Sequence, residues 1–308
     1  MKTAAVLPAL GIGDALLMMI ASHQLQRSGY HVTTFHEQLP ELGRWFPGHT
    51  FALPQESFLS SLSSFDLVVV ENDNSPKIQS LISHLRPVLS LFYPTYSPKK
   101  HPPLAPNDFV FNPDIPMAEN IAIATAGLLG LPRLSKDNGL TPPSHLIHRK
   151  NETQVLIHPT SRVAEKNWLA SSFVSVATRL KKRGFSPIFC VGPNERAEWE
   201  FIQSKGFVLA DLLHLEALAE LAYESGSIIG NDSLAGHLGS NLNLLTLIVA
   251  NDEKRMRLWR PGWRRGEVVF PPRWLPNGKF LRLRENHWQH FVSVNKVLTR
   301  FEKLLRMP

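Results

Sequence analysis

The chain has 308 residues, of which 43% are hydrophobic and 19% charged, so it can bury real cores and is neither disordered nor limited to one small domain. Its formal net charge of +7 favours anionic partners such as nucleotides, nucleic acid or an acidic membrane surface. The single cysteine, Cys190, excludes an internal disulfide, and the absence of an apolar stretch of about 18 residues or a signal-peptide pattern predicts a cytoplasmic protein.

Short apolar runs alternate with helical patterns in the first half of the chain, as is typical of β-α-β units with parallel strands. Strands are expected at residues 3–8, 30–35 and 65–70, and helices at residues 14–27 and 118–129. The proline-rich stretch 91–116 is interpreted as a long loop, and residues 135–150 as a linker.

The pattern then restarts. Strands are expected at residues 154–158, 187–191, 227–230 and 244–249, and helices at 169–182, 196–205, 215–224, 234–240 and 288–305. These elements predict an α/β protein of two facing Rossmann-like domains, residues 1–145 and 151–285, with a cleft between them and a C-terminal helix in residues 286–308 packing back. In such sheets, ligands lie beyond the carboxyl ends of the strands.

The first strand-to-helix turn contains Gly11, Gly13 and Asp14. Two glycines let the backbone approach a ligand closely, and Asp14 stands at the start of the expected helix, where it could also be a simple cap. The turn is not a dinucleotide fingerprint, because Leu16 occupies the place of the third glycine.

Two further turns lie in the second half. After His158, the hydroxyls of Thr160 and Ser161 and the charge of Lys166 could cradle a diphosphate, or could belong to a capped helix with surface cations. After residues 227–230, the stretch Asn231 to His237 would present free backbone N–H groups at a helix start to a pyrophosphate, although a lone histidine is often structural.

These turns, in this order and spacing, resemble glycosyltransferase family nine, the bacterial ADP-heptose:lipopolysaccharide heptosyltransferases. The resemblance runs from Val6 to about Val249. The stretch N-D-S-L-A-G-H-L is similar to the family's D-T-G-L-S-H-L-x-A-A, and P-T-S-R-V-A-E-K-N-W to its hydroxyl-rich turn followed by a basic residue and tryptophan. Gly192 to Glu195 is similar to its Gly-x-Pro-x-Glu turn, and Gly11 to Asp14 to its Gly-Asp turn.

The resemblance implies a fold of GT-B type with an acceptor side in the N-terminal domain and a nucleotide-sugar donor side in the C-terminal domain. Asp14 would be the general base and Lys166 a catalytic cation. The implied donor contacts are Thr160, Ser161 and Lys166 at the phosphates, Glu195 at the ribose, Asp232 at the sugar, Ser233, Leu234, Ala235 and His237 at the pyrophosphate, and Leu213 beside the adenine.

The chain departs from the family pattern at Leu234, where glycine is usual, and at Gly236, where serine is usual. Leu234 makes the backbone less permissive and affects the expected phosphate geometry. A nucleotide diphosphate is already a good leaving group, so one carboxylate and positive charge suffice for inverting transfer. No Asp-x-Asp motif or metal triad is present in the sequence, so metal-independent transfer without a cofactor is expected.

The implied partners are an ADP-sugar donor and a lipopolysaccharide or other saccharide acceptor. A UDP- or GDP-sugar donor, and a non-catalytic protein that binds anions or nucleic acid, remain alternatives. Residues 254–284 interleave basic residues with Trp259, Trp263 and Trp274. This Arg/Trp-rich segment is either a solvated face or a dock for an acidic or amphipathic acceptor, with peripheral contact at the inner face of the cytoplasmic membrane; no specific nucleic acid is expected.

Overall fold

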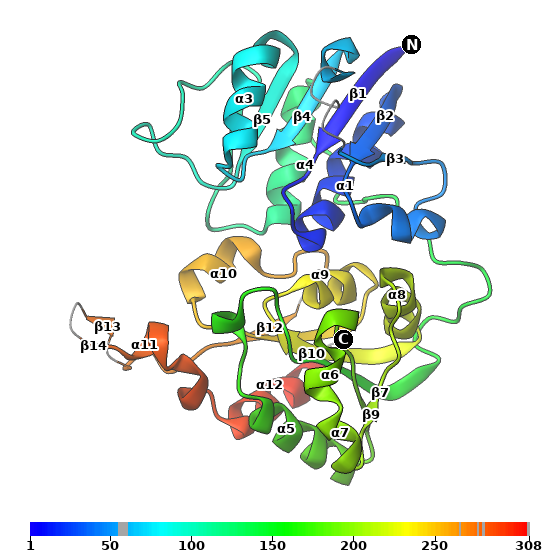
Figure 1. The fold of residues 1–308 in the computed structure, drawn as a ribbon, viewed down its shortest axis with the longest axis vertical. Helices are drawn as coiled ribbons and strands as arrows, with labels where there is room; N and C mark the ends of the chain where they lie inside the picture. The colour runs from blue at the N-terminus through cyan, green and yellow to red at the C-terminus, as the bar shows by residue number, and fades with distance from the viewer. Residues whose placement is uncertain (55–60, 265, 276, 279–280, 307–308) are drawn as a thin grey trace. The chain divides into compact units, whose positions relative to one another are not determined.

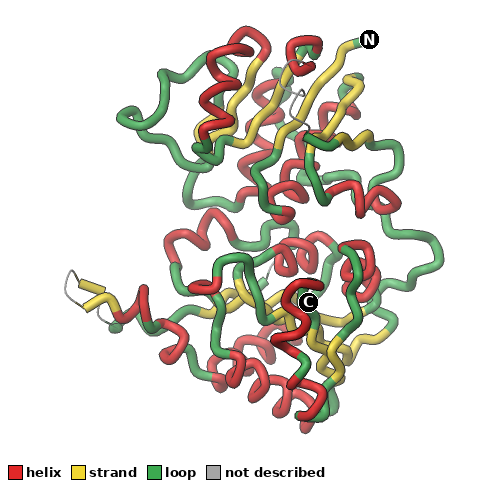
Figure 2. The backbone as a smooth tube through the Cα atoms, viewed as in Figure 1, coloured by secondary structure: helices red, strands yellow, loops and turns green. Residues whose placement is uncertain are grey.

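The computed structural model describes residues 1–54, 61–264, 266–275, 277–278 and 281–306. The chain divides into two compact units, Met1–Pro143 and Ser144–Pro308 (Figure 1). Each unit contains a six-stranded parallel sheet, and Figure 2 shows helical segments flanking the strands of each. The two sheets have the same strand order, counted within each unit as 3-2-1-4-5-6, which is the Rossmann order. The predicted α/β class with two Rossmann-like domains is therefore confirmed.

The first unit is built around the fully buried strands β4 and β5 and the buried helix α1. α3 packs Ile78, Leu81 and Leu85 on the inner strands, and α1 contacts α4 and β2. Its elements are β1 (Lys2–Leu7), α1 (Ile12–Arg27), β2 (Tyr30–Phe35), a 3₁₀ helix (Leu39–Trp45), β3 (Thr50–Ala52), a 3₁₀ turn (Leu62–Ser64), β4 (Leu67–Glu71), α3 (Pro76–Leu85), a 3₁₀ turn (Arg86–Val88), β5 (Leu89–Tyr93), β6 (Phe109–Val110) and α4 (Met117–Leu128).

The expectation of a loop over residues 91–116 was wrong at two places, because β5 ends at Tyr93 and β6 spans Phe109–Val110, whereas residues 94–108 and 111–116 form neither helix nor strand. β5 is an apolar, completely buried run whose strand pattern is obscured by the prolines that follow it. β6 is only two residues long and pairs with the end of β5. α3 was also missed, although Ser75 and Pro76 form a recognisable helix start with proline in the first turn.

The second unit surrounds one large apolar core. α5 buries Phe173 and Leu180 in it, and α12 buries Phe301 and Leu304, so the C-terminal helix packs on this unit. Its elements are β7 (Asn151–His158), a 3₁₀ turn (Ala164–Lys166), α5 (Ala170–Lys182), β8 (Ser186–Phe189), a 3₁₀ turn (Pro193–Glu195), α6 (Arg196–Trp199), α7 (Phe201–Ser204), β9 (Val208–Leu209), α8 (Leu215–Tyr223), β10 (Ser225–Asn231), α9 (Leu234–Asn241), β11 (Leu245–Val249), α10 (Glu253–Trp259), β12 (Glu267–Val269), β13 (Asn277–Gly278), β14 (Leu281–Arg282), α11 (Leu283–Asn286), a 3₁₀ turn (Trp288–Phe291) and α12 (Val294–Leu305).

Two expected helices of this unit have different bounds. Residues 196–205 form the two short helices α6 and α7 rather than one helix. The last helix begins at Val294, not at residue 288, because the Ser293 side chain accepts a hydrogen bond from Lys296 N (3.2 Å) and caps it there. In the part of the chain that the structure describes, no helix combines the length and apolarity needed to cross a membrane.

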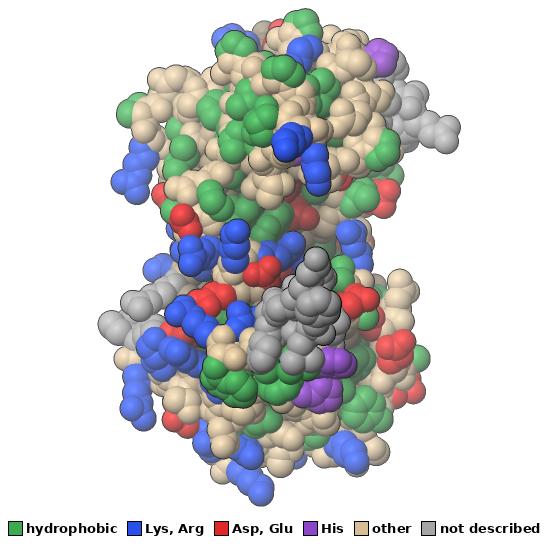
Figure 3. Space-filling model, turned by 90° about the vertical axis from the view of Figure 1, so that its left-hand side faces the viewer, with side chains coloured by type: hydrophobic (Ala, Val, Ile, Leu, Met, Phe, Trp, Pro, Cys, Tyr) green, Lys and Arg blue, Asp and Glu red, His purple; other side chains and the backbone are tan. Residues whose placement is uncertain are grey.

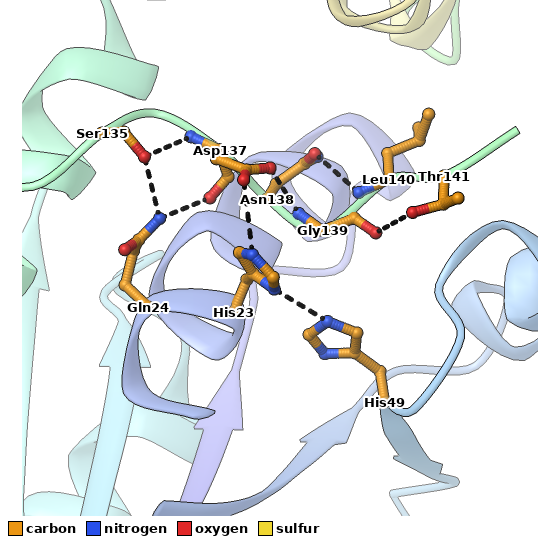
Figure 4. Close-up of polar contacts among 9 residues, drawn as sticks. All are labelled: His23, Gln24, His49, Ser135, Asp137, Asn138, Gly139, Leu140 and Thr141. Carbon is orange, nitrogen blue, oxygen red and sulfur yellow. Dashed lines mark hydrogen bonds and ion pairs between the residues drawn. The ribbon is translucent and has the colours of Figure 1, made fainter. Parts of the chain in front are cut away.

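The first part of the expected linker is held on the first unit by polar contacts (Figure 4). Gln24 donates to Asp137 O (2.8 Å), and Asn138 Nδ2 donates to Leu16 O (3.2 Å). His23 lies 3.4 Å from the Asp137 carboxylate and 3.2 Å from His49. Burial, with the neighbouring His23, lowers the pKa of His49 to about 4. The His49 ring is therefore neutral at pH 7.

Candidate functional site

The carboxyl ends of β10, β7 and β8 collect most of the residues predicted to contact a donor. These strands are neighbours in the sheet, in that order, and all are parallel. Thr160 and Ser161 follow β7, Glu195 follows β8, and Asp232 follows β10. Because parallel neighbouring strands end at the same edge, residues far apart in the sequence meet here.

Asp232 is the centre of a charge cluster at this edge. Its Oδ2 lies 2.9 Å from Lys166 Nζ and 3.6 Å from Arg255 Nε, and only 12% of its side chain is exposed. Lys166 comes from the turn after β7 and Arg255 from α10, so two cations from different segments share one carboxylate oxygen.

Arg255 is a site residue that the sequence reasoning missed, because it was counted with the Arg/Trp-rich segment. Its guanidinium lies over the Trp259 ring, 5.1 Å from the centroid. The sequence signal that could have found Arg255 is Asp252, a helix N-cap three residues before it. The Asp252 side chain accepts hydrogen bonds from the backbone N of Lys254 and Arg255, so α10 begins directly after β11.

Thr160 and Glu195 are joined directly. Glu195 Oε2 accepts a hydrogen bond from Thr160 Oγ1 (2.8 Å) and another from Gly192 N (3.0 Å). Two strand-end turns are thereby tied together, and the Glu195 carboxylate is held at the edge of the sheet.

Asn231, the last residue of β10, is a second residue that sequence reasoning left without a role. Its side chain is fully buried; Oδ1 accepts from Trp168 N (2.9 Å), and Nδ2 donates to Pro159 O (2.6 Å). It also donates to Asn167 Oδ1 (3.3 Å), which accepts from Ser161 Oγ (2.8 Å). Asn231 therefore fixes the whole turn between β7 and α5 onto the end of β10.

His237 lies in the first turns of α9 and is nearly buried. Burial lowers its pKa to about 4, against the opposing effect of Asp232, so the imidazole is neutral at pH 7. Its Nδ1 finds no hydrogen-bond partner among the described residues. A buried ring nitrogen left unpaired beside a charge cluster is suited to receive a ligand atom.

The structure accommodates both departures from the family pattern. Leu234 begins α9 and is not among the residues with positive φ, so its backbone does not require glycine. At Gly236 an added Cβ would lie 2.6 Å from Ile248 Cδ1 and 3.3 Å from Pro261 Cγ. Glycine at 236 thus lets α9 pack closely on β11 and the segment after α10.

The remaining donor residues lie around this cluster. Ser233 precedes α9, and its Oγ is 3.4 Å from His158 Nδ1. Ala235 is buried in the first turn of α9. Leu213, in the turn between β9 and α8, is 75% exposed and makes none of the contacts that join the other residues. Among the described residues, no group of three or more His, Cys, Asp or Glu side chains is arranged to hold a metal ion.

Asp14 belongs to the first unit. α1 begins at Ile12, so Asp14 is its third residue and Gly11 occupies the N-cap position. The interpretation of Asp14 as the N-cap is therefore corrected. A Cβ at Gly11 would collide with Asp14 Oδ2, so the carboxylate lies back over Gly11 and would have to move if residue 11 carried a side chain. Gly13 is the second residue of α1, between them.

The family "Glycosyltransferase family 9 (heptosyltransferase)" matches residues 119–264. This range contains every residue predicted to bind the donor, and it confirms the resemblance seen in the sequence. A comparison with curated protein sequences gives no match.

Solved structures similar to this chain share its whole fold. Escherichia coli ADP-heptose lipopolysaccharide heptosyltransferase II is 16% identical, with a TM-score of 0.71, over 99% of this chain and 98% of that one. A family 9 glycosyltransferase of Veillonella parvula is 17% identical, with a TM-score of 0.70, over 99% and 97%. The E. coli heptosyltransferase WaaC, solved with ADP, is 14% identical, with a TM-score of 0.69, over 98% and 100%.

Proposed function

We propose that this chain, a heptosyltransferase-like glycosyltransferase of family 9, moves a heptose or related sugar from an ADP-sugar donor to a hydroxyl of a saccharide acceptor such as a lipopolysaccharide core. The observation that carries the proposal is the convergence of Lys166 and Arg255 on Asp232 at the start of α9. A similar protein, WaaC, is solved with ADP and with ADP-2-deoxy-2-fluoro heptose, which supports the choice of donor.

The donor half of the reaction needs stabilisation of a departing diphosphate. Two cations and the N-terminal backbone N–H groups of α9 supply positive potential where that charge develops. The unpaired Nδ1 of neutral His237 adds a hydrogen-bonding group without adding charge. In this proposal Asp232 holds Lys166 and Arg255 in place before the donor arrives and then contacts the sugar.

The acceptor half needs one proton removed. Asp14 would take the proton of the acceptor hydroxyl as its oxygen bonds to the anomeric carbon, while the bond from that carbon to the diphosphate breaks and its electron pair leaves with the phosphate oxygen. Attack from the face opposite the leaving group inverts the configuration. No general acid is needed, because the diphosphate leaves as an anion.

Nucleotide binding tests which nucleobase the donor carries. ADP should raise the melting temperature more than UDP or GDP at equal concentration, since a ligand at 100 times its Kd adds about 2.7 kcal/mol of stability. Thermal shifts with the three nucleotides measure this preference. Equal shifts would argue against an ADP-sugar donor, and a salt-dependent affinity for random oligonucleotides as strong as that for ADP would favour the non-catalytic, nucleic-acid-binding alternative.

We also propose that the Arg/Trp-rich segment makes peripheral contact with acidic lipid. Four residues of this segment lie outside the described residues: Arg265, Pro276, Lys279 and Phe280. Trp274 is 76% exposed, whereas Arg273 is paired with Glu253. Arg255 of the segment is likewise paired with Asp232, so a weak association is expected. Figure 3 shows Lys and Arg side chains next to Asp and Glu side chains on one face.

Sedimentation with acidic vesicles at low salt should therefore carry down part of the protein, and Trp274→Ala should reduce that fraction, because interfacial tryptophan anchors such contacts. Phe201→Ala, at an exposed aromatic residue outside the segment, is the matched control. Protein that stays in the supernatant even at low salt would show that the segment only covers the fold.

A further inference from the structure

Glu71 is a buried carboxyl group that the proposed mechanism does not use. It is the last residue of β4, next to β1, where Leu7 pairs with Val70. Only 1% of it is exposed, and its Oε2 accepts a hydrogen bond from Ala9 N (3.2 Å) in the turn that leads from β1 to α1. Glu71 is therefore bonded to the turn that precedes α1, and the Asp14 carboxylate lies over Gly11 in that same turn.

The charged groups that act on Glu71 are acidic. They are Asp14 from the first turn of α1 and Asp73 from the turn after β4. Asp73 is exposed, and its Oδ1 accepts from Ser75 N (2.9 Å), so its influence is screened by water. Burial first, and Asp14 second, hold the pKa of Glu71 well above its usual range.

We propose that Glu71 is a positioning residue that sets the basicity of Asp14: the two carboxyl groups hold one proton between them, and the base that accepts the acceptor's proton is the fully ionised pair. This inference rests on the proposed function, because it assigns Glu71 a role through Asp14. An isolated aspartate is a weak base for a sugar hydroxyl, and a second negative charge in a low-dielectric site makes it stronger.

The proton balance is simple. As the pH rises, the shared proton leaves the pair for solvent, and both groups become carboxylates. During transfer the acceptor hydroxyl gives its proton to Asp14 as its oxygen bonds to the anomeric carbon, and the pair again holds one proton. That proton returns to solvent before the next turnover, so no other reactant is consumed.

The pH dependence of kcat/KM tests this pair. In the wild-type protein the rate should rise with an apparent pKa well above that of an ordinary aspartate. Glu71→Gln keeps an oxygen that can accept from Ala9 N but removes the second charge. In this variant, the pH at which kcat/KM rises on the acid side of the profile (the acid limb) should be lower by about one pH unit or more. The plateau value of kcat/KM should fall by about 10-fold, since a weaker base accepts the proton less readily.

Asp73→Asn is the matched control, because it removes the exposed carboxylate and keeps an acceptor for Ser75 N; its limb should stay in place. ADP affinity should be unchanged in both variants. An unshifted acid limb in Glu71→Gln, or a wild-type limb at the ordinary aspartate value, would overturn the inference. Failure of the proposed function is separate: it would appear as full turnover in Asp14→Asn.

Stability supplies a readout independent of activity. A carboxyl group whose pKa is raised by folding binds more protons in the folded than in the unfolded state, so the protein loses stability as the pH rises from the unfolded value of about 4.5 toward the folded one. Glu71→Gln should not show this loss, and its melting temperature relative to wild type should increase between pH 5 and 8. If the difference in melting temperature between Glu71→Gln and wild type does not change with pH, Glu71 and Asp14 do not form a buried ionisable pair.

Discussion

Replacement of Asp14 by asparagine should lower the rate of sugar transfer by about 10²–10⁴-fold, because asparagine has nearly the same shape but cannot accept the acceptor's proton. ADP binding should be unchanged, since Asp14 belongs to the first unit while the proposed donor contacts all lie in the second. Transfer rate and nucleotide affinity are measured on the same folded sample. Wild-type turnover would end the assignment of Asp14 as base, and lost ADP binding would place Asp14 at the donor.

Gly11→Ala is a second way to test the same carboxylate. The added Cβ would collide with Asp14 Oδ2 and displace it, so turnover should fall while the Asp14 carboxylate itself is retained. Gly43→Ala is the matched control in the same unit, because an added Cβ there meets nothing within 4 Å and the residue has no positive φ. Equal activity of the two alanine variants would show that the position of Asp14 over Gly11 is unimportant.

Replacement of Lys166 by alanine should weaken ADP binding by about 10- to 100-fold, the size of one lost charge-assisted hydrogen bond. Transfer should slow further than binding alone explains, because negative charge on the diphosphate grows in the transition state. The folded state should survive, since Asp232 keeps Arg255 as an ion-pair partner. Isothermal titration with ADP and steady-state kinetics separate the two effects.

Lys182→Ala removes an exposed lysine from the end of α5 in the same unit and serves as the control for net charge. It should leave ADP affinity and turnover unchanged. If Lys166→Ala behaves like this control in both measurements, Lys166 is a structural partner of Asp232 and the proposed phosphate contact is wrong.

The periodicity of the sequence was sufficient for the fold class. Apolar runs such as residues 154–158 are buried strands, and glycines at positions 29 and 184 adopt positive φ and follow helices, so local chemistry alone marks these boundaries. Prediction failed where local signals conflict. β5 is followed by a proline-rich segment, and β6 is too short to show a pattern, so only their pairing with neighbouring strands makes them strands.

The sequence by itself also determined which turns carry polar side chains, because strand ends followed by Asp14, Thr160 and Asp232 are local patterns. Only the tertiary structure decided which residues meet at them. Arg255 reaches Asp232 because β11 lies beside β10, and Glu71 reaches the turn before Asp14 because β4 lies beside β1. The order of strands in a parallel sheet follows from long-range packing, and no local spacing encodes it.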